Sequence, residues 1–336
     1  MQKWFAAALL AAGISYGATV PVAASAQEVT LALPTTSLVF LPNYVAADRG
    51  FWQKRGLEVK TPIISGAGSS NAVLAGSAEF TTIGPGSTLR LIGRGQKLSI
   101  IGTTVDRFLL EFVLRKDVAE KLPVKPDADL AARVKALKGV SFGVDSINGY
   151  SHSFLRYLSG RYGLDPERDV VVSPVQPGNL VPSLAAKRID GFIYGQPWSL
   201  QAVNDADGVI WISGVKGDVP ELAPFSYMIT IAKPETCQQR RAICEKLMAG
   251  LQDALDYIHA DPDGTYEVLR RKLPQMNPQL LRQALDVVRP AIPRSTETKV
   301  AAIAKAQEFG VIGGMMTDDE QVKDWTPYID NSFVRR

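Results

Sequence analysis

The chain has 336 residues, with 37 Lys and Arg against 34 Asp and Glu, and a formal net charge of +3. A nearly neutral chain without a basic stripe argues against nucleic-acid binding, which needs a strongly basic face. The sequence contains two histidines, which stand far apart at His152 and His259. We therefore predict no nucleic-acid partner and no metal site.

The first 26 residues predict a secretory signal peptide. Lys3 precedes an apolar stretch from Trp4 to Ile14, and small residues follow at 24–26, which is the layout of such a leader. An uncleaved membrane anchor is the less favoured alternative, because a span takes about 20 apolar residues. We predict cleavage after Ala26 and a soluble exported protein of about 310 residues. This length suffices for two lobes with separate cores.

The first half of the expected mature chain predicts one α/β unit. Short apolar runs alternate with helical patterns, which is typical of a sheet with mainly parallel strands. The predicted strands cover 29–35, 57–64, 78–84 and 98–104, and the predicted helices cover 43–56, 69–77 and 87–95.

A second α/β unit follows residue 117. Its predicted helices cover 129–137, 150–163 and 179–189, and its predicted strands cover 139–145, 170–175, 190–195 and 209–213. The alternation in "FSYMITIAK" predicts a return strand over 225–233. The chain then becomes mostly helical from about residue 237 to 309.

Two segments, 74–84 and 185–195, resemble each other. Each has a small-residue helix end, an acid, a strand and a glycine five positions after the acid, at Glu79 and Gly84 or Asp190 and Gly195. Chance similarity between two βαβ units is one explanation. The other is a protein with two lobes whose equivalent loops face each other across a cleft.

Four loops that follow predicted strands have the composition of a ligand-binding site: "PTTSLVFLP", "SGAGSSN", "GPGS" and "DSINGYS". Ligands of open α/β sheets bind beyond the carboxyl ends of the strands, where the next helix presents unpaired N–H groups. Plain helix capping by Ser, Asn and Asp is the alternative for any single loop. Because four loops share this composition, we predict that a small ligand pairs with their amides.

Signatures of enzymes are incomplete in this chain. "GAGSSN" lacks the third glycine of a dinucleotide-binding loop, and "GYSHS" lacks the closing glycine of a nucleophile elbow. His152 lies beside Ser151 and Ser153, but neighbours on a helix point apart. We therefore predict a protein without catalytic residues and without a cofactor.

The two cysteines, Cys237 and Cys244, predict a disulfide in an exported protein. Seven residues along one straight helix separate two Cα atoms by roughly 10 Å, beyond the limit of about 7 Å for a bridge. We therefore place Cys237 in a turn after Pro234, before the helix that carries Cys244. Two reduced thiols are the alternative.

The segment "LPNYVAADRGFWQKRGLEVKTPIISGAGSSNAVLAGSAEFTTIGPGSTLRLIGRGQ" resembles the start of a family of ABC-transporter substrate-binding proteins, the nitrate/sulfonate/taurine and thiamine-precursor family. "LVPSLAAKRIDGFIYGQPW" and "DWTPYIDNSFV" fit the same family. The resemblance implies a type II periplasmic binding fold, with two α/β lobes that close by hinge bending. It places crossover strands near 111–114 and 225–229, lobe 1 at 27–114 and 225–336, and lobe 2 at 115–224. A monomer would then serve a permease and an ATPase on separate chains.

The resemblance also implies the ligand contacts. They are Ser37, Leu38, Val39, Phe40, Gly66, Gly68, Ser69, Gly84, Gly86, Ser87, Asn148, Gly149, Tyr150 and Ser151, with Gln196 and Trp198 closing the cleft. Many relatives carry Glu at the position of Gln196, so a cationic ligand is disfavoured here. Phe40, Tyr150 and Trp198 either stack on a planar ligand or pack the lobes together.

With neutral donors dominating these loops, we expect a small anion, such as a sulfonate, nitrate or carboxylate, with an aromatic body as an option. Arg107 either meets this anion or pairs with Asp106 or Glu111. Two other functions stay open at this point. They are an enzyme on the same fold, as in pyrimidine or menaquinone synthesis, and a ligand-sensing module for a signalling receptor.

Overall fold

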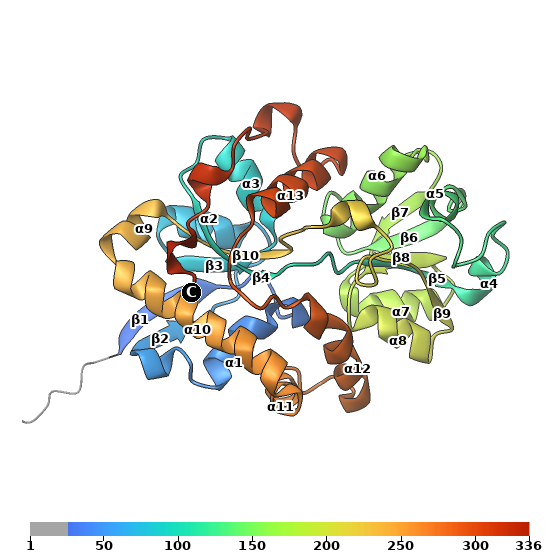
Figure 1. Ribbon diagram of the computed structural model, residues 1–336. Coiled ribbons are helices and arrows are strands. Elements are labelled where there is room, and N and C mark those ends of the chain that lie inside the picture. The colour runs from blue at the N-terminus through green and yellow to red at the C-terminus, as the bar shows by residue number, and fades with distance from the viewer. Residues whose placement is uncertain (1–25, 336) are drawn as a thin grey trace, which may run out of the picture.

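The computed structural model describes residues 26–335, which form two α/β lobes, each built on a five-stranded sheet (Figure 1). The predicted signal peptide up to residue 25 lies outside the described residues. Within the described part of the chain, no helix has the length and apolar character needed to cross a membrane.

The first sheet has the strand order β2-β1-β3-β10-β4. Strand β1 runs parallel to β2 and β3, whereas β10 runs antiparallel to both β3 and β4. The strands are β1 (Gln27–Ala32), β2 (Leu57–Lys60), β3 (Phe80–Ile83), β4 (Ser99–Val105) and β10 (Met228–Ala232). The helices that follow its strands are α1 (Leu41–Asp48), α2 (Gly68–Ala75) and α3 (Pro85–Gly93).

The second sheet repeats this arrangement in the order β7-β6-β8-β5-β9. Strand β6 runs parallel to β7 and β8, and β5 runs antiparallel to β8 and β9. The strands are β5 (Glu111–Arg115), β6 (Ser141–Val144), β7 (Val171–Pro174), β8 (Gly191–Tyr194) and β9 (Gly208–Ser213). The helices of this lobe are α4 (Lys116–Ala119), α5 (Leu130–Lys135), α6 (Tyr150–Tyr162), α7 (Pro177–Ala185) and α8 (Trp198–Asp205).

The chain passes between the sheets twice, at 106–110 and at 214–227. The sequence placed the first crossover at 111–114, inside lobe 1, but these residues form β5 and pair with β8 and β9 of the second sheet. Similarly, Met228 and Ile229 already pair with β4 of the first sheet. A crossing segment and a strand are both extended and apolar, so the local pattern does not distinguish them. After each crossing, the chain forms the antiparallel strand of the sheet that it enters. This strand is β5 in the second sheet and β10 in the first.

The predicted helix over 43–56 is divided in two. Helix α1 ends at Asp48, Gly50 takes a left-handed conformation with a φ of 69°, and a short 3-10 turn follows at Gln53–Arg55. Trp52, which lies in this break, is 1% exposed and donates from Nε1 to the carbonyl of Leu247. The continuous amphipathic helix that the pattern predicts is therefore interrupted, and the interruption lets the indole of Trp52 pack against α10.

The C-terminal segment contacts both lobes. Its helices are α9 (Pro234–Gln239), α10 (Arg241–Ala260), α11 (Pro262–Lys272), α12 (Pro278–Val288) and α13 (Val300–Ile312). Helix α10 packs on α1, α12 contacts α8 of the second lobe, and α13 lies between α3 and α6 (Figure 1). The segment therefore packs on the first lobe and also contacts the second.

The predicted disulfide between Cys237 and Cys244 is present, with a Cα–Cα distance of 5.7 Å. The predicted turn is wrong, because Cys237 lies in the short helix α9. The chain breaks at Arg240, between α9 and α10, and this break lets the two helices fold onto each other.

An aromatic group joins the two lobes where the chain crosses. The ring of Phe108 lies 4.6 Å from Phe154, 5.2 Å from Phe225 and 5.1 Å from Phe309, measured between centroids. Phe108 and Phe225 belong to the two crossing segments, whereas Phe154 lies in α6 and Phe309 in α13. The main core therefore continues from one lobe into the other on this side of the molecule.

Candidate ligand-binding site

A cavity of about 490 Å³ lies between the lobes, and all four predicted loops contribute to it. Both glycines of the sequence echo, Gly84 and Gly195, line it from opposite lobes. The lining residues are Pro34, Thr35, Ser37, Val39, Phe40, Gly66, Ala67, Ile83, Gly84, Gly86, Ser87, Arg90, Leu109, Leu110, Asp145, Asn148, Gly149, Tyr150, Ser151, Tyr194, Gly195, Gln196, Tyr227, Met228, Val288, Gly314 and Met315.

Most of the predicted contact residues line this cavity, and four do not. Leu38 and Trp198 instead line an adjoining groove of about 610 Å³ between α8 and α12. Gly68 and Ser69 lie in the first turn of α2, where the buried Ser69 hydroxyl donates to the carbonyl of Gly66. Trp198 begins α8 and lines only this groove, whereas Gln196 lines both the groove and the cavity.

The helix starts around the cavity are only partly free, which corrects the prediction of open amides. The N–H of Asn148 donates to Nδ1 of His152 at 3.1 Å, and the N–H of Gly86 donates to the Tyr150 hydroxyl at 3.2 Å. At the start of α2, the N–H of Ser69 donates a hydrogen bond to the carbonyl of Gly66. At the start of α6, the N–H groups of Tyr150 and Ser151 have no acceptor within the described residues.

His152 stabilises the loop and does not face the adjacent serines. Its ring is 3% exposed, and its Nδ1 accepts the hydrogen bond from Asn148, whose φ of 62° is left-handed. Burial lowers the pKa of His152, and the nearby Arg156 lowers it further. The imidazole is therefore neutral near pH 7 and holds the turn that precedes α6.

Among the described residues, two charged side chains line the cavity, and the sequence motifs predicted neither of them as a contact. Arg90 lies on α3 and has no carboxylate within 4.0 Å in the described part of the chain. Asp145 follows β6 and accepts a hydrogen bond from the Ser151 hydroxyl at 2.6 Å. Helix periodicity could have indicated Arg90, because it lies three residues after Ser87 and four after Gly86.

Arg107, in contrast, takes no part in the cavity. It is exposed, and within residues 26–335 it forms no ion pair with Asp106 or Glu111. Glu111 is 1% exposed and points into the second lobe. Neither alternative that the sequence left open for Arg107 therefore holds.

Glu111 explains the glutamine at position 196. Its carboxylate accepts from the Nε2 of Gln196 at 2.8 Å, from the Ser199 hydroxyl at 2.6 Å and from the Ser213 hydroxyl at 2.5 Å. Burial raises the pKa of Glu111, and the bonds from the two serines partly oppose this. A second carboxylate at position 196 would face the first one. The carboxyl group that position 196 lacks in this chain is therefore provided by Glu111, to which Gln196 donates.

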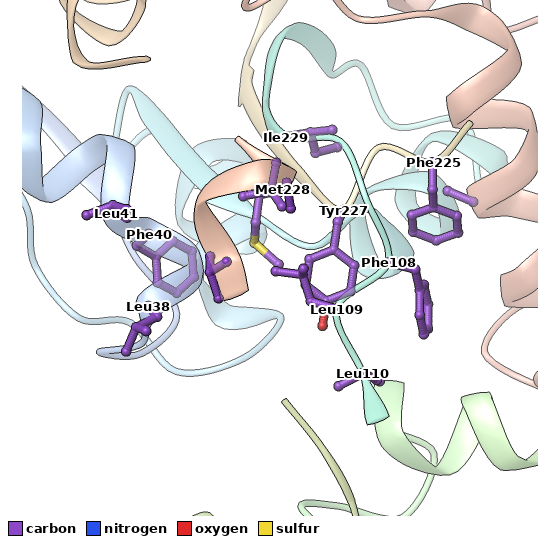
Figure 2. Packing of buried hydrophobic residues seen from close by; sticks show 14 of the residues in the cluster. Leu38, Phe40, Leu41, Phe108, Leu109, Leu110, Phe225, Tyr227, Met228 and Ile229 are labelled. Carbon is purple, nitrogen blue, oxygen red and sulfur yellow. The ribbon is translucent and has the colours of Figure 1, made fainter. Parts of the chain in front are cut away.

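The rest of the cavity wall is largely apolar and aromatic. Leu109 and Leu110 follow Phe108 along one crossing segment, whereas Tyr227 ends the other crossing segment and Met228 begins β10 (Figure 2). The loop before α1 adds Phe40, α6 adds Tyr150 and β8 adds Tyr194. Such walls suit a ligand with an apolar body and few polar groups.

Comparison with known proteins agrees with this architecture. The nitrate/nitrite binding protein NrtA of Nostoc sp. is 26% identical over 188 residues, which cover 50% of this chain and 40% of that protein. The nitrate import ATP-binding protein NrtC of Synechocystis sp. is 28% identical over 177 residues, covering 50% of this chain and 26% of that protein. The chain thus spans less than half the length of these relatives.

Among solved structures, the alkanesulfonate-binding protein SsuA from Xanthomonas axonopodis, bound to MOPS, has the same fold. It aligns with a TM-score of 0.68 at 16% identity, covering 92% of this chain and 99% of that one. The predicted type II periplasmic binding fold is therefore confirmed. The model of the NMT1-like family matches residues 25–271. Because this match covers most of the chain, the protein belongs to the NMT1-like family.

Proposed function

We propose that this chain is a periplasmic solute-binding receptor, which captures an organic anion between its lobes and delivers it to an ABC importer. The observation that carries the proposal is Arg90, a cation without a carboxylate partner among the described residues, in the wall of an inter-lobe cavity. A cationic guanidinium beside apolar walls favours an anionic group over a neutral one. The permease and the ATPase would be separate chains, as the resemblance of the sequence implies.

The size of the cavity favours an organic anion over a small inorganic one. Its volume of about 490 Å³ falls in the range of pockets that hold molecules with an apolar body. Nitrate or bicarbonate would fill only a small part of this space and would leave the apolar walls in contact with water. A sulfonate or carboxylate with an aliphatic or aromatic body would cover those walls.

The polar groups of the cavity support binding over catalysis. The Ser151 hydroxyl already donates to Asp145, and Nδ1 of His152 already accepts from the backbone N–H of Asn148. A nucleophile needs a base within hydrogen-bond reach that is itself oriented by a third group. The described residues around the cavity offer no histidine or cysteine for that role.

We place the hinge at 106–110 and 214–227, with the first lobe formed by 27–105 and 228–335 and the second by 111–213. Polar contacts connect the rims of the lobes, such as the bond of 3.0 Å from Asn204 Nδ2 to Gln283 Oε1. Contacts of this kind exchange readily with water, because a typical hydrogen bond contributes only about 1 kcal/mol net. Opening and closing of the lobes would therefore admit and then enclose the ligand.

Thermal unfolding with a panel of solutes tests the proposal. The panel contains nitrate, bicarbonate, alkanesulfonates, aromatic carboxylates and amines, each at millimolar concentration. A ligand at 100 times its dissociation constant stabilises the folded state by about 2.7 kcal/mol, so we expect organic anions to raise the melting temperature by several degrees. No response to any anion, or a response to simple amines alone, would contradict the proposal.

The proposal also includes export. The disulfide between two buried cysteines fits an oxidising compartment. Mass spectrometry of a periplasmic extract should give a mature chain that begins at Gln27. A full-length chain that stays in the cytoplasm would contradict this part of the proposal.

A further inference from the structure

The two charges that line the cavity come from opposite lobes. Arg90 belongs to α3, which follows β3 of the first sheet, and Asp145 follows β6 of the second sheet. Among the described residues they are the only charged side chains in the cavity wall. A ligand that fills the cavity therefore meets a cation on one side and an anion on the other.

Asp145 is positioned to accept more than one hydrogen bond. One carboxylate oxygen accepts from the Ser151 hydroxyl at 2.6 Å, and the other lies 3.5 Å from the Ser146 hydroxyl, at the limit of a hydrogen bond. A carboxylate has about four acceptor positions, so Asp145, which lines the cavity, can accept further hydrogen bonds from a donor there. A purely anionic ligand would leave this capacity unused and would place like charges in the same cavity.

The hydroxyls of two tyrosines in the cavity wall are further hydrogen-bond acceptors beside Asp145. The side chain of Tyr227 is 6% exposed, and within residues 26–335 neither its hydroxyl nor that of Tyr194 has a hydrogen-bond partner. Burial and then the charge of Asp145 raise the pKa of Tyr194 to about 12, so the phenol stays neutral. Neutral phenols accept from a donor through oxygen, and their ring faces attract cations.

We propose that the ligand is a zwitterion, with an acid group that pairs with Arg90 and an ammonium group that pairs with Asp145. The hydroxyls of Tyr194 and Tyr227 take the remaining ammonium hydrogens, and the apolar walls contact the body between the two charges. Each lobe then supplies one charged partner for the ligand, so the closed form gains both ion pairs only when such a ligand is bound. The inference rests on the proposed receptor function and specifies its ligand class.

Isothermal titration with pairs of isosteric probes tests the inference. Homotaurine is compared with butanesulfonate, and para-(aminomethyl)benzoate with para-ethylbenzoate, so that a methyl group replaces the ammonium in each pair. Benzylamine supplies the cation alone. We expect at least one zwitterion to bind at least tenfold more tightly than its isostere, and Asp145→Asn to abolish this preference. The amide of the substituted side chain retains an oxygen for the Ser151 hydroxyl, so the loop stays folded.

Asp127→Asn is the matched control, because Asp127 is exposed and lies outside the cavity. It should keep the preference for the zwitterion unchanged. Tighter or equal binding of the isosteres, or a preference that survives Asp145→Asn, would overturn the inference and leave the receptor function standing. Failure of all anions and zwitterions to bind, or binding of benzylamine alone, would overturn both.

Discussion

The backbone N–H of Gly86, in the first turn of α3, donates a hydrogen bond of 3.2 Å to the hydroxyl of Tyr150, in the first turn of α6. The two helices belong to different lobes. First-turn amides have no acceptor within their own helix, so they bind either ligands or other groups of the protein. Here the side chain of Tyr150 in one lobe accepts the hydrogen bond of a first-turn amide in the other, and this bond joins the two lobes.

Tyr150→Phe should shift the ligand-free protein toward an open form. The substitution removes the cross-lobe hydrogen bond, which contributes about 0.5–1.5 kcal/mol, and leaves the ring packing in place. Small-angle X-ray scattering should show a larger radius of gyration for the variant without ligand. Tyr266→Phe is the control, because its hydroxyl bonds the Pro278 carbonyl within one lobe. An unchanged radius in the Tyr150 variant would contradict the expectation.

Arg90→Gln should weaken binding of organic anions by about tenfold to a hundredfold. A charge-assisted hydrogen bond contributes about 1.5–3 kcal/mol, and the neutral amide of glutamine keeps only part of it. Titration of the variant with the anion that gives the largest thermal shift measures the change. Arg168→Gln serves as the control, since that side chain is 86% exposed. If Arg90→Gln binds the anion as tightly as the native chain, Arg90 does not contact it.

Gln196→Glu should destabilise the protein by about 2–3 kcal/mol at pH 7. The new carboxylate would face Glu111, whose pKa burial already raises, and two adjacent buried carboxylates cannot both ionise at low cost. The folded-state pKa of the pair lies above the unfolded value of about 4.3. The destabilisation should therefore be small near pH 4 and grow as the pH rises.

Urea unfolding at several pH values measures this change. The exposed Gln279→Glu variant is a suitable control, because it adds the same charge outside the second lobe. A destabilisation of Gln196→Glu that is independent of pH would argue for a steric cause in place of repulsion between the two carboxylates.

Removal of the disulfide by Cys237→Ala with Cys244→Ala should lower stability without changing ligand affinity. Closing a loop of this length in the unfolded chain is worth about 2–3 kcal/mol, and the bridge lies between α9 and α10, outside the cavity wall. Urea unfolding and titration with an organic anion measure the two quantities. Reduction of the native protein should give a similar loss of stability, whereas a marked fall in affinity would show that the bridge supports the site.

The elements next to the cavity could be predicted well, because their signals are local. Gly163 and Gly76 end α6 and α2 in left-handed conformations, as glycine permits. The loops after β1, β2, β3 and β6 reach the cavity because the carboxyl ends of parallel strands meet at one edge of a sheet. Trp198 was misplaced, because the turn of the chain into α8 decides which of two adjoining hollows its side chain faces.

By itself, the sequence determined the order of strands and helices, the family and the loops that surround the cavity, because spacing, glycines and apolar periodicity act over a few residues. Only the tertiary structure decided that Arg90 and Asp145 line one cavity, that Tyr150 occupies the Gly86 amide and that β5 belongs to the second sheet. These relationships join residues far apart in the chain. Their energies depend on how the two lobes pack, and no local pattern records that packing.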